Sequence, residues 1–383
     1  MPPTASARAL TGALLLTGIP VAVAFPNSQN PFAGGPPVEI PSEASCTVTL
    51  FDHEALALYG AVFTAPYAGP PPGCPGPWAK VGLGFTGSVA GVQYDRAGAL
   101  WLGGVELLRT TTPEPDAPGI SWVVDRDLTA YSALFYKASN ATLQIPNTVN
   151  DQYTGVLYIT ARLVFFPLTA GSDDEAAKAA WADAVIPLAP PPANSNPWGS
   201  MAIAGTTAKT VPLQFPRVDV TEVFLDLYAS GHGCEEFWYS NVPGEWAGPL
   251  GICGASVQDL LSPFLALCPL GISCITTNLV LITLVLHMWG QLGGGSYRQI
   301  EVYIDGLAAG ILYPFPVVYT GGVNPLLWRP LTGIYSFNIP PYEFDLTPFA
   351  GVLNDGKTHQ LSIIVLGNND EGSWFVDPVL RLS

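Results

Sequence analysis

The clearest strand in the sequence is the stretch GVLYITARLVFF, which runs from Gly155 to Phe166. It is rich in β-branched and aromatic residues, the side chains that pack best on a pleated surface. Three other stretches, at residues 221–228, 299–305 and 359–365, alternate apolar and polar residues with a period of two. This alternation is typical of half-buried strands. These segments indicate a protein built mainly from β-strands.

Shorter apolar segments fill the rest of the chain, with residues 81–87 and 99–108 as further expected strands. The 40 glycines and 38 prolines are spread along the 383 residues, which interrupts long helices but suits short strands joined by turns. The only good helix candidate is Asp173–Ile186, which has acidic residues in its first turn and an alanine-rich body. We therefore expect an all-β protein with two β-sandwich domains.

The expected organisation follows from where these segments and their breaks fall. It comprises a signal peptide at 1–24, a linker at 25–45, a first sandwich at 46–168, a helix and Pro-rich linker at 169–210, and a second sandwich at 211–383.

The N-terminus has the three features of a secretory signal peptide. Arg8 supplies a positive charge, Leu10–Val21 is an apolar stretch, and residues 22–24 form a small-x-small cleavage site. A membrane anchor needs about 20 apolar residues, and Pro20 and the polar residues after Phe25 argue against one. We expect secretion to the medium, the cell wall or the vacuole.

Charge narrows the choice of partners. The formal net charge is −16, and cleavage after residue 24 removes one further positive charge. Such a chain offers no basic face for nucleic acid, and an anionic membrane would repel it. Only 11% of the residues are charged, with an acidic bias, which suits an acidic compartment where carboxylates lose charge.

Residues 250–291 do not fit this pattern, because they contain one acidic residue, no Lys or Arg, and three of the six cysteines. A membrane span is one interpretation, but Pro263 and Pro269 break the segment into runs that are too short. A buried insertion is another. We favour the hypothesis of a translated intron: the codons of residues 251–253 can contain a splice donor, and Gln291 can be encoded by a splice acceptor.

Without that segment three cysteines remain, and Cys46 and Cys74 are the natural disulfide pair in an oxidising compartment. Cys234 is then the odd one. A catalytic thiol formed by Cys234 and His232 is disfavoured, because residues two apart in a strand merely share a face. Asn140 begins the one glycosylation sequon.

The common catalytic signatures are absent, and the four histidines lie too far apart for a local metal motif. We expect neither a metal nor another cofactor. What remains are carboxylates beside aromatic residues at 93–96, 106–115 and 235–241. Aromatic faces stack on sugars, and carboxylates and amides bind their hydroxyls. Partial burial raises a carboxyl pKa and suits it to acid–base work. The structural alternative is that these are corner ion pairs and core tryptophans.

At these residues the sequence resembles the peptide-N-glycosidase A family, the secreted glycoamidases of plants and fungi. The resemblance rests on an ordered series of short motifs over more than 300 residues, none of them specific alone. The motifs are Thr49–His53, Pro71–Cys74, Gln93–Arg96, Trp101–Arg109, Glu114–Pro115, Tyr153–Gly155, Glu235–Asn241, Ile304–Gly306, Pro314–Pro316, Tyr319–Gly322, Asn324–Pro325, Trp328–Pro330, Tyr342, Asp345–Pro348, Asp355–Lys357 and His359.

The resemblance implies two jelly-roll-like sandwiches and hydrolysis of the amide that joins asparagine to N-acetylglucosamine, with an N-glycoprotein or glycopeptide as substrate. The expected catalytic carboxylates are Glu236 and Asp95 first, then Glu235, Glu106 and Glu114. The expected substrate-binding residues are Trp238, Tyr239, Asn241, Arg96, Arg109 and Trp101. Family members usually continue beyond the position of Ser383, so this form is inactive if that region completes the site.

Three other functions stay open at this point. A carbohydrate-binding protein would bind glycans and release no product. A structural wall protein would do neither. A glycosidase also uses paired carboxylates, but it would leave N-acetylglucosamine on asparagine, whereas an amidase leaves aspartate.

Overall fold

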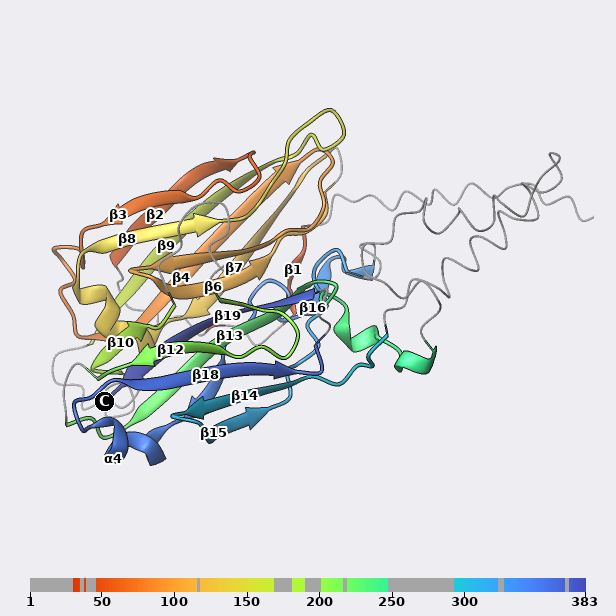
Figure 1. Cartoon of the computed structure of the whole chain (residues 1–383). Coiled ribbons are helices and arrows are strands. Elements are labelled where there is room, and N and C mark those ends of the chain that lie inside the picture. The colour runs from red at the N-terminus through yellow and green to blue at the C-terminus, as the bar shows by residue number, and fades with distance from the viewer. Residues whose placement is uncertain are drawn as a thin grey trace, which may run out of the picture.

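The computed structural model describes residues 30–34, 38, 46–115, 118–168, 181–189, 201–215, 219–246, 293–322, 327–368 and 372–383. Their strands form two β-sandwiches that lie one above the other in Figure 1. The expectation of an all-β protein with two sandwiches is confirmed. The predicted signal peptide at 1–24 lies outside the described residues.

The first sandwich is made of two four-stranded antiparallel sheets. One sheet has the order β2 (Cys46–Leu56), β9 (Val156–Pro167), β4 (Trp78–Ala90), β7 (Ile120–Asp127). The other has the order β3 (Phe63–Tyr67), β8 (Ser139–Gln144), β5 (Ala97–Leu102), β6 (Val105–Thr111). A 3₁₀ segment, η1 (Thr129–Tyr136), follows β7. Alternate residues of β9, such as Ile159 and Leu163, are buried between the sheets, as the period-two pattern predicts.

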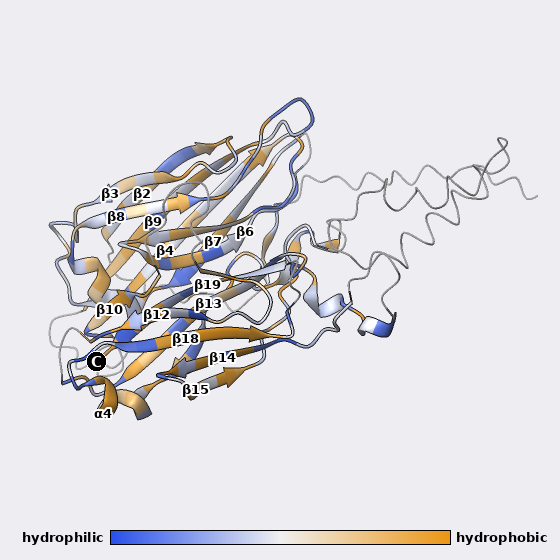
Figure 2. Ribbon diagram, in the orientation of Figure 1, coloured by the Kyte–Doolittle hydropathy of each residue, from blue (hydrophilic) through white to orange (hydrophobic). Residues whose placement is uncertain are grey.

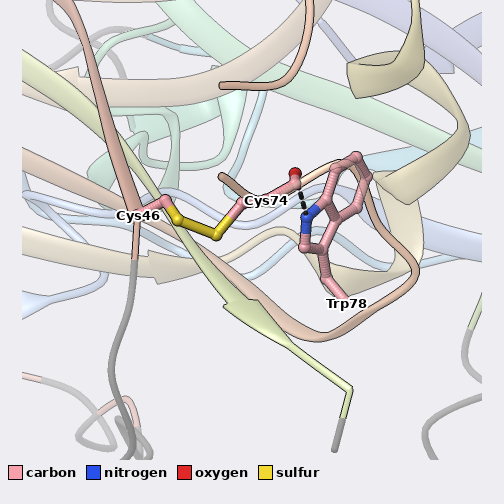
Figure 3. Close-up of a disulfide and its surroundings, with 3 residues drawn as sticks. All are labelled: Cys46, Cys74 and Trp78. Atoms are coloured by element: carbon pink, nitrogen blue, oxygen red, sulfur yellow. Dashed lines mark hydrogen bonds between the residues drawn. A yellow bond between two sulfur atoms is a disulfide. The ribbon is translucent and has the colours of Figure 1, made fainter. Parts of the chain in front are cut away.

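A disulfide ties the start of the first sandwich to the loop before β4. Cys46 and Cys74 are bonded to each other, as predicted, and Trp78 Nε1 donates a hydrogen bond to the carbonyl of Cys74 at 3.1 Å. Figure 3 shows this arrangement. The indole is fully buried and stacks on Tyr136.

The second sandwich also has two sheets. The first has the order β10 (Ala184–Pro187), β19 (Gly372–Leu382), β13 (Val223–Gly233), β17 (Tyr342–Asp345), with β11 (Ala202–Ile203) also paired to β19. The second has the order β12 (Lys209–Leu213), β18 (His359–Leu366), β14 (Gln299–Ile304), β15 (Leu307–Leu312). Short helical segments are η3 (Trp238–Ser240), η4 (Gly244–Trp246), η6 (Thr347–Phe349) and α4 (Ala350–Leu353). Figure 2 shows apolar residues along β14, β15 and β18.

Three expectations need correction. The predicted helix Asp173–Ile186 is wrong at its end, because β10 pairs with β19 there and tertiary pairing overrides local propensity. The rest of that prediction, up to residue 180, lies outside the described residues. The predicted linkers contain strands: β1 (Phe32–Gly34), which pairs with β16 (Leu331–Ile334), lies within 25–45, and β11 lies within 169–210. The predicted strand at 99–108 is a hairpin, because Gly103 and Gly104 adopt φ of 57° and 87°.

A buried polar cluster joins the two sandwiches. Arg109 on β6 donates to Ser230 Oγ at 2.9 Å and to the Phe375 carbonyl at 2.7 Å. Trp101 Nε1 on β5 donates to Asp377 Oδ2 on β19 at 2.8 Å. Since each bond crosses from one sandwich to the other, this cluster fixes how the loops at the junction face each other.

Candidate active site

Three carboxylates converge where the sandwiches meet. Asp95 lies in the connection between β4 and β5, Glu114 follows β6, and Glu236 follows β13. Each side chain is half-buried. The negative charge of Asp95 raises the pKa of both Glu114 and Glu236, so Asp95 lies near each of them. All three are among the acids predicted from the sequence, where Glu236 and Asp95 rank ahead of Glu114.

A tight loop at residues 319–322 holds two of these carboxylates. The Gly321 backbone N–H donates to Asp95 Oδ2 at 3.0 Å. A Cβ added at Gly321 would lie 2.4 Å from Glu114 Oε1 and 2.6 Å from Asp95 Cγ. The loop is anchored on the first sandwich, because Thr320 hydrogen-bonds to Thr111 Oγ1 at 3.1 Å. A larger residue at this position would therefore have to displace both carboxylates.

Burial sets the protonation of the cluster. It raises the pKa of Glu114 to about 7, with the Asp95 charge as the second cause. It raises the pKa of Glu236 to about 7 for the same two reasons. Burial also raises the pKa of Asp95, but the Gly321 hydrogen bond and the Arg96 charge oppose this shift. The pKa of Asp95 is thus raised by burial, while the Gly321 hydrogen bond and the Arg96 charge favour its ionised form.

Glu236 borders a cavity of about 10 Å³ lined mainly by apolar side chains, together with Ser230, Tyr319 and Tyr342. That volume holds about one water molecule. A larger cavity of about 230 Å³, beside Arg126 and Tyr335, has none of the three carboxylates in its lining.

Two predicted catalytic acids have a different environment. Glu106 forms a fully buried bidentate pair with Arg109, at 2.8 and 2.7 Å. Glu235 forms a second buried pair with Arg298, and it accepts a hydrogen bond from Trp374 Nε1 at 2.8 Å. Because both oxygens of each carboxylate are engaged by buried partners, these contacts favour a structural role over the predicted catalytic one.

Three predicted binding residues are likewise buried. Trp101 is 1% exposed and Trp238 is 8% exposed. Trp238 packs on Trp374 and Tyr239, with Arg298 over its ring at 5.8 Å. Neither indole presents a face to a sugar, and Arg109 is fully buried, so the structure corrects these three assignments.

The other predicted binding residues stay near the carboxylates. Tyr239 lies close enough to Glu236 for that charge to raise its pKa to about 12, after burial as the main cause. Neither the Tyr239 hydroxyl nor Asn241 Nδ2, both buried, has a hydrogen-bond partner among the described residues. Arg96 is held by Gln93 Oε1 at 3.1 Å.

Sequence reasoning missed the roles of Gly321 and Arg329. The Arg329 charge lowers the pKa of Glu114, and the neighbouring Trp328 donates its indole N–H to the Gly322 carbonyl at 2.7 Å. The paired glycines after Tyr319 were the available signal, since adjacent glycines in a loop often mark a close backbone approach.

A family model described as Peptide N-acetyl-beta-D-glucosaminyl asparaginase amidase A matches residues 35–250 and 284–378. The chain belongs to this amidase A family. A curated relative, the Peptide-N4-(N-acetyl-beta-glucosaminyl)asparagine amidase A of Prunus dulcis, is 30% identical over 356 residues, which cover 90% of this chain and 55% of the relative. The chain thus spans about half the length of that relative.

Solved structures agree with the fold of this amidase A family member. Two structures of PNGF-II, in different space groups, each align over 88% of this chain and 65% of theirs. Their TM-scores are 0.52 and 0.51, at 11% and 12% sequence identity. At this level of identity the likeness concerns the fold alone.

Other predictions on this amidase A family chain have mixed outcomes. Cys234 is disulfide-bonded, which corrects its interpretation as a leftover cysteine and excludes it as a catalytic thiol. Asn140 is exposed on β8, and its glycosylation stays a prediction.

Residues 247–292 lie outside the described residues, and the family match passes over 251–283.

Within the described part of the chain, no group of three or more His, Cys, Asp or Glu side chains is arranged to hold a metal ion. The helices described there are too short or too polar to cross a membrane.

Proposed function

We propose that this chain is a glycoamidase that cleaves the amide between asparagine and N-acetylglucosamine in glycopeptides or glycoproteins. The observation that carries the proposal is the convergence of Asp95, Glu114 and Glu236 in a member of the amidase A family. Water and the amide yield aspartate and a glycosylamine, so the reaction consumes one water molecule and releases the intact glycan.

The three carboxyl groups fit the proton transfers of amide hydrolysis. Asp95, which the Gly321 N–H and Arg96 favour in its ionised form, takes a proton from water as the water oxygen attacks the amide carbon. Glu236, whose pKa is about 7, is protonated at mildly acidic pH and donates its proton to the leaving nitrogen as the carbon–nitrogen bond breaks.

The developing oxyanion also needs stabilisation. Glu114, with a pKa of about 7, holds a second proton at mildly acidic pH and donates a hydrogen bond to the oxyanion, while the Arg96 guanidinium contributes positive charge. The Tyr239 hydroxyl and Asn241 Nδ2, which lack partners among the described residues, bind hydroxyl and acetamido groups of the sugar.

The test is the Glu236→Gln variant with a defined N-glycopeptide at about pH 5, followed by intact mass. We expect turnover to fall by more than about 100-fold, while folding and glycopeptide binding are retained. The control is Glu222→Gln at an exposed glutamate. Near wild-type turnover by Glu236→Gln would refute the assignment of the acid.

The wild-type result tests the function itself. Loss of the whole glycan with asparagine converted to aspartate supports the glycoamidase. Binding without product identifies a carbohydrate-binding protein instead, and N-acetylglucosamine left on asparagine identifies a glycosidase.

We also propose that the chain is secreted after cleavage at residue 24. The disulfide between Cys46 and Cys74 supports an oxidising compartment. N-terminal sequencing of the exported protein should begin at Phe25, and retention of residues 1–24 contradicts the proposal.

A further inference from the structure

Three loops form one surface at an end of the first sandwich, which we call the loop surface: residues 57–61, 91–96 and 145–155. Backbone bonds join them, from Val149 N to the Ala57 carbonyl at 3.3 Å and from Gly155 N to the Val92 carbonyl at 3.1 Å. The third loop, between β8 and β9, projects at the upper right of the sandwich in Figure 1.

The loop surface is unusually apolar for exposed turns. Its most exposed apolar side chains are Leu58 at 71%, Tyr59 at 73%, Val92 at 52%, Tyr94 at 50% and Val149 at 37%. Contiguous exposed apolar residues mark interaction sites more often than scattered ones do.

This surface runs directly into the three carboxylates. Tyr94 precedes Asp95, and its ring lies 4.9 Å from that of Tyr153 at 49°. The Arg96 guanidinium lies 5.9 Å from the centre of the Tyr94 ring, and its charge lowers the pKa of Asp95 and Glu114. A ligand whose reacting bond lies at the carboxylates can therefore continue over Tyr94 and Tyr153.

Several polar groups of the loop surface are used internally, although Arg96 Nε has no partner among the described residues. The Gln93 amide donates to the carbonyls of Thr148 and Gly155, Thr154 Oγ1 accepts from Val92 N, and Asn150 Oδ1 accepts from Gln152 N and Tyr153 N. A sugar needs hydrogen bonds for its hydroxyls as well as an aromatic face, so this surface suits apolar side chains better than a glycan.

The segment after Glu236 differs in chemistry. The Tyr239 hydroxyl and Asn241 Nδ2 are buried there without partners among the described residues, and Tyr239 lies close enough to Glu236 for that charge to raise its pKa. The bond to be cleaved joins a sugar to a peptide. A site with a polar segment after Glu236 and an apolar surface beside Asp95 can therefore bind the two parts of the substrate through different groups.

We propose that the loop surface binds the polypeptide beside the glycosylated asparagine and that it selects substrates with apolar residues there. This inference rests on the proposed glycoamidase function. It adds a peptide-binding surface, and a preference in the peptide, to the chemistry of the carboxylates.

The experiment uses the full chain and two unglycosylated peptides of equal length, one with Leu, Val and Phe around the asparagine and one with Gly and Ser. Their dissociation constants are measured by fluorescence anisotropy. The same two flanking sequences are then used as N-glycopeptides for kcat and KM. The test variant is Leu58→Ser with Tyr59→Ser.

The matched control is Leu307→Ser with Tyr313→Ser, which removes equally exposed side chains (66% and 68%) at and just after β15 of the other sandwich. We expect wild type and control to bind the apolar peptide at least about tenfold more tightly than the Gly/Ser peptide. The test variant should lose that difference, and its KM should rise for the apolar glycopeptide alone with kcat retained.

Equal binding of both peptides by the wild type overturns the inference, as does an equal loss on both glycopeptides in the test variant. Selective peptide binding without turnover on either glycopeptide overturns the proposed glycoamidase function and leaves the peptide-binding surface standing. The two failures are therefore distinguishable.

Discussion

At the scale of single residues, the site depends on a backbone contact that no side-chain pattern reveals. Gly321 approaches Asp95 and Glu114 so closely that a Cβ would collide with both carboxylates. Its N–H favours the ionised form of Asp95 through the bond at 3.0 Å. Gly321 thus contacts both carboxyl groups, and its N–H favours the ionised form of Asp95.

We predict that Gly321→Ala lowers kcat/KM by at least about tenfold and moves the acidic limb of the pH–rate profile to higher pH. The N–H bond lowers the pKa of Asp95, so its loss raises that pKa and delays ionisation. The control is Gly351→Ala, where an added Cβ meets nothing within 4 Å. An unshifted acidic limb contradicts this role of Gly321.

At the scale of elements, strand β6 carries the buried pair that joins the sandwiches. Glu106 and Arg109 are three residues apart on β6, and Arg109 continues to Ser230 on β13 and Phe375 on β19. Asp377 lies next to this pair, and its pKa is raised by burial and then by the charge of Glu106. The cluster orients the loops that carry Asp95, Glu114 and Glu236.

We predict that Glu106→Gln destabilises the protein by about 3–5 kcal/mol, because it removes the bidentate counter-charge of the buried Arg109. The measurement is the free energy of unfolding in urea, and Glu222→Gln should change it by no more than about 0.5 kcal/mol. Replacing both partners, as Glu106→Leu with Arg109→Met, should recover much of the loss. Unchanged stability with lost turnover would instead assign Glu106 to catalysis.

At the scale of the whole molecule, the segment predicted to be anomalous, 250–291, departs from the family only in part. The family match passes over 251–283, as an insertion or a translated intron would require, but it includes residues 284–291, which the intron hypothesis removes. The disulfide at Cys234 argues against the intron hypothesis. A chain without this segment keeps three cysteines, and two of them already pair with each other.

We predict that a form lacking residues 251–291 folds cooperatively, because the family match closes over most of the gap, and that it carries one titratable thiol, at Cys234. Thermal unfolding and thiol titration after denaturation measure both. Failure to fold contradicts the prediction. Transcripts that keep these codons refute the intron hypothesis whatever the shortened form does.

β-branched and aromatic residues at 155–166 were enough to predict strand β9, and period two along 221–228, 299–305 and 359–365 was enough to predict β13, β14 and β18, because alternation reports which face is buried. It could not place the hairpin break at Gly103 and Gly104, where backbone φ decides, or the strand β10, where pairing with β19 overrides an alanine-rich helical pattern.

The sequence by itself determined the β architecture and the family motifs, since these follow from residue type and spacing, and it predicted Asp95, Glu114 and Glu236 among five candidate acids. Only the tertiary structure decided that Glu106 and Glu235 are neutralised by Arg109 and Arg298, and that Trp101 and Trp238 are core residues. The physical reason is that burial and charge partners set what a carboxylate or an indole can do. Segments more than 200 residues apart, such as those of Asp95 and Gly321, meet only when the two sandwiches pack together.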